Sequence, residues 1–200
     1  GLLRSQGLEV FVSDSNPEPP MRNDFDRLGF PSETGGHSVE IFTGAEEIVV
    51  SPGVPLHIDV LDAARAAGIG VVSELEVALR YLQGEVVAVT GSNGKTTTTS
   101  LVAAILGASA RPVQVGGNIG IAVSDLVSPS TEETINVLEV SSFQLEGSSR
   151  FRPRVGVLLN ITPDHLDRYA DFETYRMAKF KLFENQTEED FAVINMDDPQ

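Results

Sequence analysis

The apolar residues of this chain form short runs that alternate with segments of helical character. Strands are predicted at 8–13, 46–50, 70–72, 85–90, 134–139, 155–160 and 191–195. Helices are predicted at 1–7, 59–67, 74–82, 95–106, 119–127 and 171–185. Short strands that alternate with helices predict an α/β protein with parallel sheets covered by helices.

The pattern changes at Gly84, which predicts a small α/β domain over residues 1–83 and a larger one over residues 84–200. Residues 15–36 are rich in Pro, Asn, Asp and Gly, which predicts a loop with at most one short helix. The chain opens as if in mid-helix and stops just after a strand. We therefore expect both domains to be incomplete, the first at its N-terminus and the second at its C-terminus.

Charge and composition narrow the class of protein. The 29 acidic and 14 basic residues give a formal net charge of −15, which disfavours binding to nucleic acid or to an anionic membrane. With no cysteine, disulfides and thiolate chemistry are excluded. The sequence shows no signal peptide and no apolar run near the ~18 residues of a membrane span. We expect a cytoplasmic protein.

The strongest chemical signal is the turn between strand 85–90 and helix 95–106. It reads Gly91-Ser92-Asn93-Gly94-Lys95-Thr96-Thr97. Glycines let successive N–H groups face a phosphate at the positive end of the helix, Lys95 adds a cation, and the Thr96 hydroxyl can bind Mg²⁺. Val89 stands where the eight-residue phosphate-loop pattern has its first glycine, so this loop is a shortened variant.

Two further polar groups follow predicted strands of the same sheet. Glu139 ends strand 134–139, where a carboxylate can hold Mg²⁺ beside the phosphate loop or simply face solvent. His165 follows strand 155–160 and is either a metal ligand, a group that orients a substrate carboxylate, or a loop histidine without a role. Spacing alone predicts that Lys179, on helix 171–185, is a solvent-exposed charged residue.

In the first domain, candidate ligand contacts also lie at strand ends. Asp14 closes strand 8–13, and Ser51-Pro52-Gly53 follows strand 46–50. An acid about 20 residues after a glycine loop contacts ribose or base in nucleotide-binding α/β domains, and that glycine loop would precede Gly1. Ordinary turn chemistry is the alternative for both segments. For His37 and His57 we expect no role.

Taken together, these segments resemble the Mur ligases, the ATP-dependent amide-forming enzymes of peptidoglycan precursor synthesis. The resemblance covers nearly the whole chain and is weak over residues 15–44. The matching segments are Thr90–Thr97, Gly116–Gly120, Glu139–Leu145, Asp164–Tyr169 and Ala178-Lys179. Phe143-Gln144 best distinguishes between members of the family, because the related ligases that add diaminopimelate or lysine carry His-Ala at these two positions. It favours the family member that adds D-glutamate to UDP-N-acetylmuramoyl-L-alanine.

The resemblance implies three domains, of which this chain holds most of two. A Rossmann-like domain, here residues 1–83, binds the UDP part of the substrate. A P-loop-type domain with a parallel sheet, here residues 84–200, binds ATP. A third domain, absent here, helps to bind ATP and the amino acid. The implied reaction runs through an acyl phosphate with ATP and Mg²⁺, in a cytoplasmic monomer, and we expect the fragment alone to be inactive.

The resemblance also implies a role for each candidate residue. The residues implied in catalysis are Lys95, His165 and Lys179, the last as a carbamylated lysine that supports a second metal ion. The residues implied in metal binding are Thr96, Glu139 and His165, and those implied in ATP binding are Gly91 to Thr97. The residues implied in substrate binding are Asp14, Ser15, Ser51, Pro52, Gly53, Gly117, Asn118, Ser141 and Gln144. Ser15-Asn16 stands where the family often has Thr-Arg.

Three alternatives stay open. One is another ligase of the superfamily, such as a folylpolyglutamate synthase-like enzyme, against which Phe143-Gln144 argues. A second is a P-loop phosphotransferase or nucleotide switch, which needs only residues 91–97 and leaves Asn118, Glu139 and His165 without a shared purpose. The third is a non-catalytic nucleotide-binding fragment.

Overall fold

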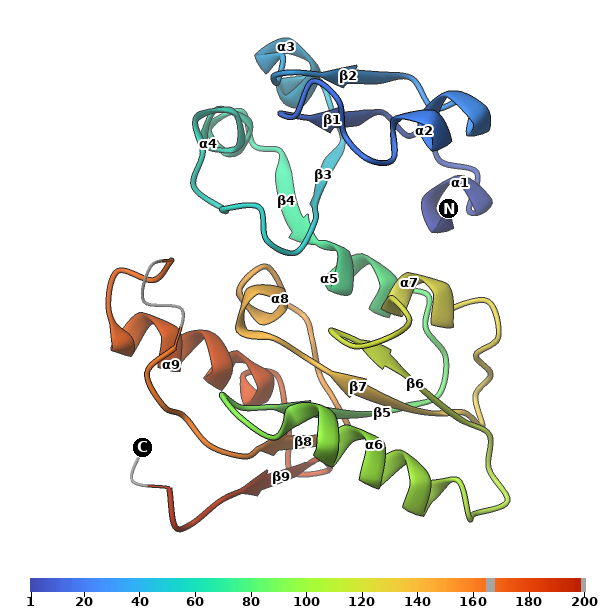
Figure 1. Ribbon diagram of the computed structural model, residues 1–200, viewed down its shortest axis with the longest axis vertical. Coiled ribbons are helices and arrows are strands. Elements are labelled where there is room, and N and C mark those ends of the chain that lie inside the picture. The colour runs from blue at the N-terminus through green and yellow to red at the C-terminus, as the bar shows by residue number, and fades with distance from the viewer. Residues whose placement is uncertain (165–167, 199–200) are drawn as a thin grey trace. The chain divides into compact units, whose positions relative to one another are not determined.

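A computed structural model describes residues 1–164 and 168–198 and shows helices and strands alternating along the chain (Figure 1). The contacts divide the chain into two units, Gly1–Val50 with Val54–Val71, and Ser51–Gly53 with Val72–Gln200. The predicted α/β class is confirmed. The division falls upstream of the predicted boundary at 83/84 because α5 (Glu74–Leu79) packs against α7 and α8 of the second unit.

The first unit is built from short elements. β1 and β2 pair in parallel, with Asp14 opposite Thr34, and β3 pairs with β4. The strands are β1 Val12–Asp14, β2 Ser32–Thr34, β3 Glu47–Val50 and β4 Gly70–Ser73. The helices are α1 Leu2–Ser5, α2 Arg22–Leu28, α3 Val39–Thr43 and α4 Asp59–Ala66. A small apolar cluster of Val50, Val60 and Leu61 packs α4 against β3.

Several predictions for the first unit were wrong in detail. The strand predicted at 8–13 begins at Val12 and includes Asp14, because its pairing partner β2 faces only that stretch. The segment 15–36 holds both α2 and β2 rather than a loop with one short helix. The sequence of β2, Ser-Glu-Thr, has no apolar alternation and therefore gave no strand signal.

The second unit contains a five-stranded sheet in the order β6-β7-β5-β8-β9, and every neighbouring pair is parallel. The strands are β5 Glu85–Thr90, β6 Val113–Gly117, β7 Ile135–Glu139, β8 Val155–Leu158 and β9 Phe191–Ile194. Every residue of β7 is buried, as expected for a central parallel strand covered on both faces. Its register sets Glu139 beside Val89 of β5 and Gly117 of β6.

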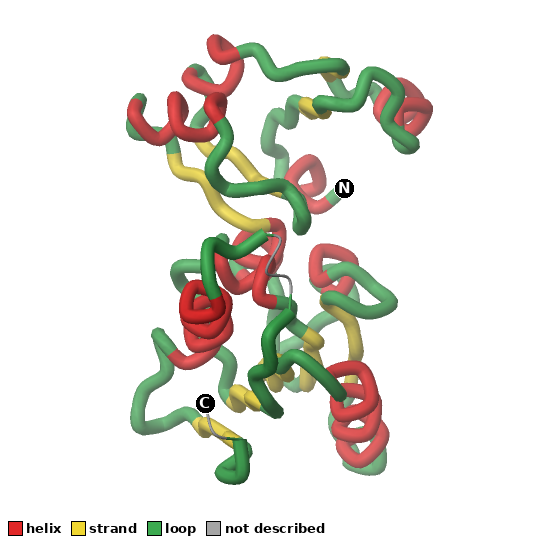
Figure 2. Tube along the Cα trace, turned by 60° about the vertical axis from the view of Figure 1, so that its left-hand side comes forward, coloured by secondary structure: helices red, strands yellow, loops and turns green. Residues whose placement is uncertain are grey.

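Because all these strands are parallel, their carboxyl ends meet at one edge of the sheet. The helices that follow are α6 Lys95–Leu106, α7 Val123–Leu126, α8 Ser142–Glu146 and α9 Phe172–Phe180, with a 3₁₀ turn at Lys181–Phe183. Figures 1 and 2 show α6 on one face of the sheet and α9 on the other. A cluster that includes Leu158, Tyr169 and Tyr175 ties α9 to the end of β8.

Four elements of this unit differ from expectation. β6 and α8 were not predicted, because β6 ends in two glycines, which are poor strand formers, and α8 spans little more than one turn. The helix predicted at 119–127 is only the short α7. The helix predicted at 171–185 ends as α9 at Phe180 and continues as the 3₁₀ turn.

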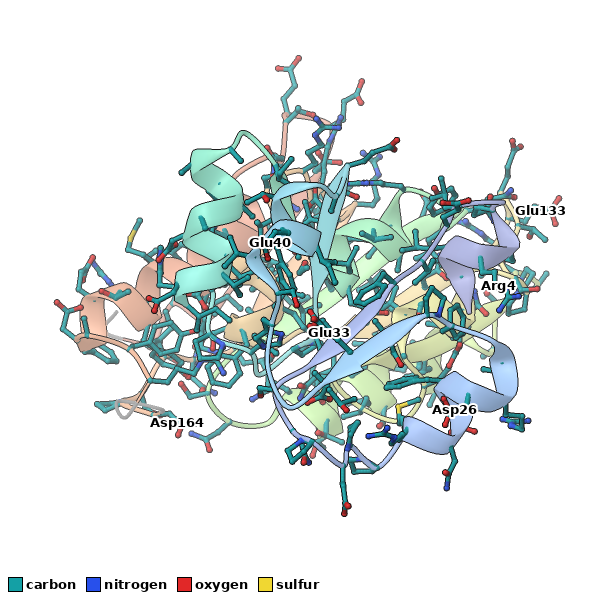
Figure 3. All side chains as sticks on the ribbon, turned by 90° about the horizontal axis from the view of Figure 1, so that it is seen from above. Arg4, Asp26, Glu33, Glu40, Glu133 and Asp164 are labelled. Carbon is teal, nitrogen blue, oxygen red and sulfur yellow. The ribbon has the colours of Figure 1, made fainter. Side chains whose placement is uncertain are left out.

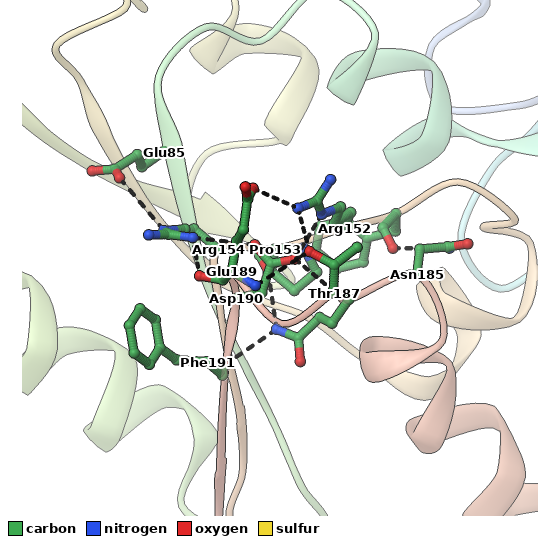
Figure 4. Close-up of polar contacts among 11 residues, drawn as sticks. Glu85, Arg152, Pro153, Arg154, Asn185, Thr187, Glu189, Asp190 and Phe191 are labelled. Atoms are coloured by element: carbon green, nitrogen blue, oxygen red, sulfur yellow. Dashed lines mark hydrogen bonds and ion pairs between the residues drawn. The ribbon is translucent and has the colours of Figure 1, made fainter.

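Ion pairs join the amino ends of the strands, on the edge opposite to the phosphate loop (Figure 4). The Arg152 guanidinium lies 2.6 Å from Asp190 Oδ2 and bonds Thr187 Oγ1 at 2.8 Å. Arg154 lies 3.6 Å from Asp190 Oδ1 and also faces Glu85 at 3.9 Å. These contacts link the segments that enter β5, β8 and β9. The hydrogen bond from Arg152, and next that from the Thr187 N–H, hold the pKa of Asp190 below its usual range.

Gly84 allows the tight turn that leads into β5, and we expect Gly84→Ala to destabilise the protein. Its φ is +86°, and an added Cβ would lie 2.1 Å from the Thr134 carbonyl oxygen. A side chain there would strain the backbone and clash, at a cost of about 2 kcal/mol or more. Gly120→Ala is the matched control, because φ is +63° there and nothing lies within 4 Å of the added Cβ. Equal losses of unfolding free energy in the two variants, measured in urea, would contradict this account.

The lowered pKa of Asp190 predicts how stability changes with pH. A carboxyl whose pKa is lower in the folded state contributes stability above its unfolded pKa of about 3.9, and loses it as the pH falls through the folded pKa. We expect wild type to melt above Asp190→Asn at pH 7, with the gap closing below about pH 4. Thermal unfolding of both proteins from pH 7 to pH 3 measures the gap. A gap that stays constant to pH 3 would exclude the Asp190 contribution.

Candidate functional site

The loop between β5 and α6 has the backbone that a phosphate-binding turn needs. Gly94 caps α6 with φ +79°, in the left-handed region that favours glycine. Gly91 has φ +152°, and an added Cβ would lie 3.1 Å from Leu159 Cβ, so the segment directly after β8 closes one side of the turn. The N-terminus of α6 therefore opens on the carboxyl edge of the sheet, where its N–H groups can bind an anion.

Side chains of the loop bind the segment that follows β8. Ser92 Oγ donates to the Thr162 carbonyl at 2.9 Å and accepts from the Thr162 N–H at 3.0 Å. Asn93 and Asn160 form a reciprocal pair, with backbone-to-side-chain bonds of 2.9 and 3.1 Å. The loop shape is thus fixed by the neighbouring strand end as well as by its own glycines.

Two lysines meet at the Gly91 carbonyl. Lys95 Nζ donates to the carbonyls of Gly91 and Ser92, each at 3.0 Å, and Lys179 Nζ donates to the Gly91 carbonyl at 3.0 Å. Lys179 is only 2% exposed. Burial, and next the positive charge of Lys95, lower the pKa of Lys179 to about 8, while Asp164 acts in the opposite direction. Lys179 is therefore a buried group at the phosphate loop, whereas spacing alone indicated a solvated charge.

A buried carboxylate lies beside the first turn of α6. Glu139, which is 1% exposed, accepts from Thr96 Oγ1 at 2.7 Å through Oε2 and from Asn118 Nδ2 at 2.7 Å through Oε1. The structure thus brings Lys95, Thr96 and Glu139 to one edge of the sheet. Carboxylate and hydroxyl oxygens are ligands that suit Mg²⁺. Among the described residues, no group of three or more His, Asp or Glu side chains gathers as a metal cluster.

His165, expected as the other metal ligand, lies outside the described residues. Thr97, expected in ATP binding, is exposed in the first turn of α6. Ser141 and Gln144 form the capping box of α8, in which Gln144 Oε1 accepts from the Ser141 N–H at 3.0 Å. The side-chain oxygen of Gln144, Oε1, thus accepts hydrogen bonds within the capping box. This leaves the side-chain NH₂ of Gln144 as the group that would contact a substrate.

The remaining expected substrate contacts lie elsewhere in the two units. Asp14 is the last residue of β1 and Ser15 follows it; Asp14 Oδ1 accepts the Asn16 N–H at 2.8 Å. Ser51, Pro52 and Gly53 are exposed, and the Gly53 carbonyl accepts from Arg168 Nη1 at 2.5 Å.

The end of β2 carries a polar cluster that the sequence did not predict. Glu33, labelled in Figure 3, accepts from Ser13 Oγ at 2.8 Å and from the N–H and hydroxyl of Ser38 at 3.0 and 2.6 Å. Although burial acts to raise it, these hydrogen bonds hold the pKa of Glu33 below its usual range. His37, for which no role was expected, bonds Ser13 Oγ through Nδ1 at 2.7 Å.

Sequence reasoning also missed residues of the phosphate loop's surroundings. Tyr175, 1% exposed, bonds Ser92 Oγ at 2.9 Å. It lies four residues before Lys179 and hence on the same face of α9. The resemblance, which implies a role for Lys179 in the site, could have pointed to Tyr175, because a helix that brings one residue to the loop presents its i−4 neighbour there too. Asn160 and Thr162 gave no comparable signal, since their contacts depend on how the chain leaves β8.

Comparison with known proteins identifies the relatives of this chain. Residues 89–200 match the Mur ligase middle domain, and residues 2–73 match the N-terminal domain of MurD-like Mur ligases. A UDP-N-acetylmuramoylalanine–D-glutamate ligase of Koribacter versatilis is 48% identical over 98% of this chain and 44% of its own length. Another of that name, from Acidobacterium capsulatum, is 49% identical over 98% of this chain and 43% of its own length. The chain therefore spans less than half the length of these relatives.

A solved structure supports the fold. It is the UDP-N-acetylmuramate:L-alanyl-gamma-D-glutamyl-meso-diaminopimelate ligase from Neisseria meningitides, which covers 99% of this chain and 67% of its own chain with a TM-score of 0.63. Its sequence identity is 22%, so the likeness is one of fold. Because the middle-domain match alone covers more than half of the residues, the chain belongs to the Mur ligase family.

Proposed function

We propose that the full-length protein joins D-glutamate to UDP-N-acetylmuramoyl-L-alanine at the expense of ATP. The observation that carries the proposal is the contact of the Thr96 hydroxyl with the buried Glu139 carboxylate, 2.7 Å apart, directly after the Lys95 loop. The curated relatives, which bear the name of this ligase, support the choice of amino acid and acceptor. The protein is a cytoplasmic monomer in this proposal, and no helix of the described residues is long and apolar enough to cross a membrane.

The proposed reaction has two steps. The carboxylate of the L-alanyl group attacks the γ-phosphorus of ATP, the bond from that phosphorus to the bridging oxygen breaks, and ADP leaves. The deprotonated amine of D-glutamate then attacks the acyl carbon, and inorganic phosphate leaves as the amide forms. Lys95 and the N–H groups of the loop neutralise charge that develops on the transferred phosphoryl group.

Mg²⁺ would be held by the Thr96 hydroxyl and Glu139, with His165 as a further expected ligand. The donor set fits this ion, since both described groups offer oxygen and the buried carboxylate has only neutral donors in its two hydrogen bonds described above. The ion supplies positive charge where an anionic carboxylate approaches an anionic triphosphate. Thr96 is exposed and Glu139 is buried, so of these two residues Thr96 is the one that solvent reaches.

We also propose that Lys179 is carbamylated in the active enzyme. Its neutral amine would add CO₂ and lose a proton, which turns a buried cation into an anion. Burial, and next the repulsion from Lys95, lower the pKa of Lys179, and an anion at this position would remove that repulsion. As a carbamate it would support a second metal ion.

The UDP substrate would contact residues of each unit. Ser141 and Gln144 would contact its muramoyl part, Gln144 through the amide NH₂. Asp14, Ser15 and Ser51 to Gly53 would contact the uridine and the diphosphate. These residues end a strand or lie in the segment that comes after one, in line with the rule that ligands of open α/β sheets bind at the carboxyl ends of strands.

The proposed function predicts a strict substrate requirement. Full-length protein should release ADP and phosphate only when UDP-N-acetylmuramoyl-L-alanine and D-glutamate are both present, because the amine must resolve the acyl phosphate. Hydroxylamine should replace D-glutamate and give a hydroxamate. A panel of other amino acids tests the alternative ligases. ATP turnover without the UDP substrate, or absence of hydroxamate, would favour the P-loop phosphotransferase instead.

The lowered pKa of Lys179 predicts a stability effect. An amine whose pKa is about 8 when folded and about 10.4 when unfolded penalises folding while it is protonated, by on the order of 3 kcal/mol. In buffer free of CO₂ and bicarbonate, where the amine is unmodified, we expect wild type to gain stability relative to Lys179→Met as the pH rises from about 8 to about 10. Thermal unfolding at each pH measures the difference, with Lys181→Met as the control for loss of a lysine nearby. A difference that does not change with pH would show that Lys179 is not held in the buried, unmodified state.

A further inference from the structure

Arg168 joins two segments that lie far apart along the chain. Its Nη1 donates to the Gly53 carbonyl at 2.5 Å. The Cζ atom of the same guanidinium lies 4.2 Å from the centre of the Phe143 ring, which belongs to α8. Ser51–Gly53 and α8 both belong to the second unit. One side chain therefore links the loop after β3 to the helix after β7.

The Phe143 ring is itself held among other aromatic rings. It stacks on Tyr169, with centroids 5.8 Å apart and an angle of 9° between the planes. Tyr169, 5% exposed, contacts Tyr175 edge to face with centroids 5.3 Å apart. Tyr175 in turn bonds Ser92 Oγ of the phosphate loop at 2.9 Å. The ring that Arg168 covers is therefore fixed by packing against groups that reach the phosphate loop.

The Ser51–Gly53 loop has little packing to hold it. All three of its residues are exposed, and Gly53 has φ +101°, in the left-handed region that favours glycine. Among the described residues, nothing lies within 4 Å of a Cβ added at Gly53. The hydrogen bond to the Gly53 carbonyl therefore fixes the loop where packing does not. A guanidinium suits this task, because its N–H groups bond a carbonyl while its flat face covers a ring.

We propose that Arg168 is a positioning residue that holds the Ser51–Gly53 loop at a fixed place relative to α8. The inference rests on the proposed function, in which this loop contacts the uridine and the diphosphate, and Asn118 and Gln144 contact the muramoyl part. These are parts of one molecule, so the residues that bind them must be correctly separated at the same time. A site arranged before the substrate arrives binds it more tightly, because less freedom is lost on binding.

The same arrangement gives Phe143 a role that the sequence did not assign. The Phe143-Gln144 pair distinguishes between members of the family, but the resemblance implies a substrate contact for Gln144 alone. In the structure the ring of Phe143 supports the guanidinium of Arg168 through a cation–π contact. Phe143 therefore acts on the loop through Arg168, without touching the substrate.

The inference predicts a selective loss of affinity for the UDP substrate in the full-length protein. For Arg168→Met we expect the KM for UDP-N-acetylmuramoyl-L-alanine to rise about tenfold and kcat to change less than about twofold, because the lost support is equal in the ground and transition states. The KM for ATP should not change. Rates of phosphate release at saturating D-glutamate measure all three constants.

Phe143→Leu gives a second variant if Arg168→Met does not fold. It removes the ring but keeps an apolar side chain, and it should raise the KM for the UDP substrate by a similar factor. The double variant should lose about tenfold in total, since each change removes the same support. An additive loss of about a hundredfold would show that the two residues act independently and would overturn the inference.

Ionic strength separates positioning from a direct contact between Arg168 and the diphosphate. A direct ion pair is screened by salt, so the KM ratio of Arg168→Met to wild type would fall toward one between about 50 and about 500 mM KCl. That outcome would overturn the inference. For a positioning residue, whose contacts are a carbonyl and a ring, we expect the ratio to stay constant.

Arg154→Met is the matched control. Arg154 belongs to the same unit, and its guanidinium lies 5.2 Å from the centre of the Phe191 ring, where it also faces Asp190 and Glu85. Its loss removes a stacked guanidinium at the other edge of the sheet. We expect both KM values to stay as in wild type, even if the melting temperature falls.

The remaining outcomes separate the inference from the proposed function. An unchanged KM for the UDP substrate in Arg168→Met, or an equal rise in Arg154→Met, would overturn the inference while wild type remains an active ligase. Failure of wild type to turn over ATP with the UDP substrate and D-glutamate would instead reject the proposed function, and the inference with it.

Discussion

A carboxylate buried at the end of a fully buried strand is the constraint on which the second unit depends. The Glu139 carboxylate needs hydrogen-bond donors in that position, because burying an unpaired carboxylate costs several kcal/mol. Its donors come from two neighbours of β7 in the fold, the first turn of α6 and the loop after β6. The need to satisfy one charge therefore fixes how the phosphate loop and the glycine loop lie against each other.

Helix α9 adds the other half of the site. Its buried face presents Tyr175 to Ser92 and Lys179 to the Gly91 carbonyl, both in the phosphate loop. The same face packs in the apolar cluster with Leu158 and Tyr169. The same surface of α9 therefore makes both its apolar contacts and its hydrogen bonds to the phosphate loop.

Much of this arrangement could be predicted because it follows from local patterns. The apolar run before Gly91 and the Gly-Lys-Thr step set the strand, the turn and α6, and the parallel sheet placed Glu139 at the same edge. The burial of Lys179 could not be predicted, since it depends on where α9 packs. β2 escaped prediction because its register with β1 comes from pairing rather than from its polar sequence. The bond from Arg168 to the Gly53 carbonyl joins residues far apart along the chain, so no spacing predicts it.

The ion pairs of Arg152 and Arg154 with Asp190 lie at the amino ends of the strands, whereas Lys95, Thr96 and Glu139 lie at the carboxyl ends. The length of the strands separates the two groups. Ion pairs that stabilise the fold and residues that would take part in the reaction therefore lie at opposite edges of one sheet. An engineer, or natural selection in a warmer habitat, can reinforce the first rim with new charge pairs and leave the reacting groups at the second untouched.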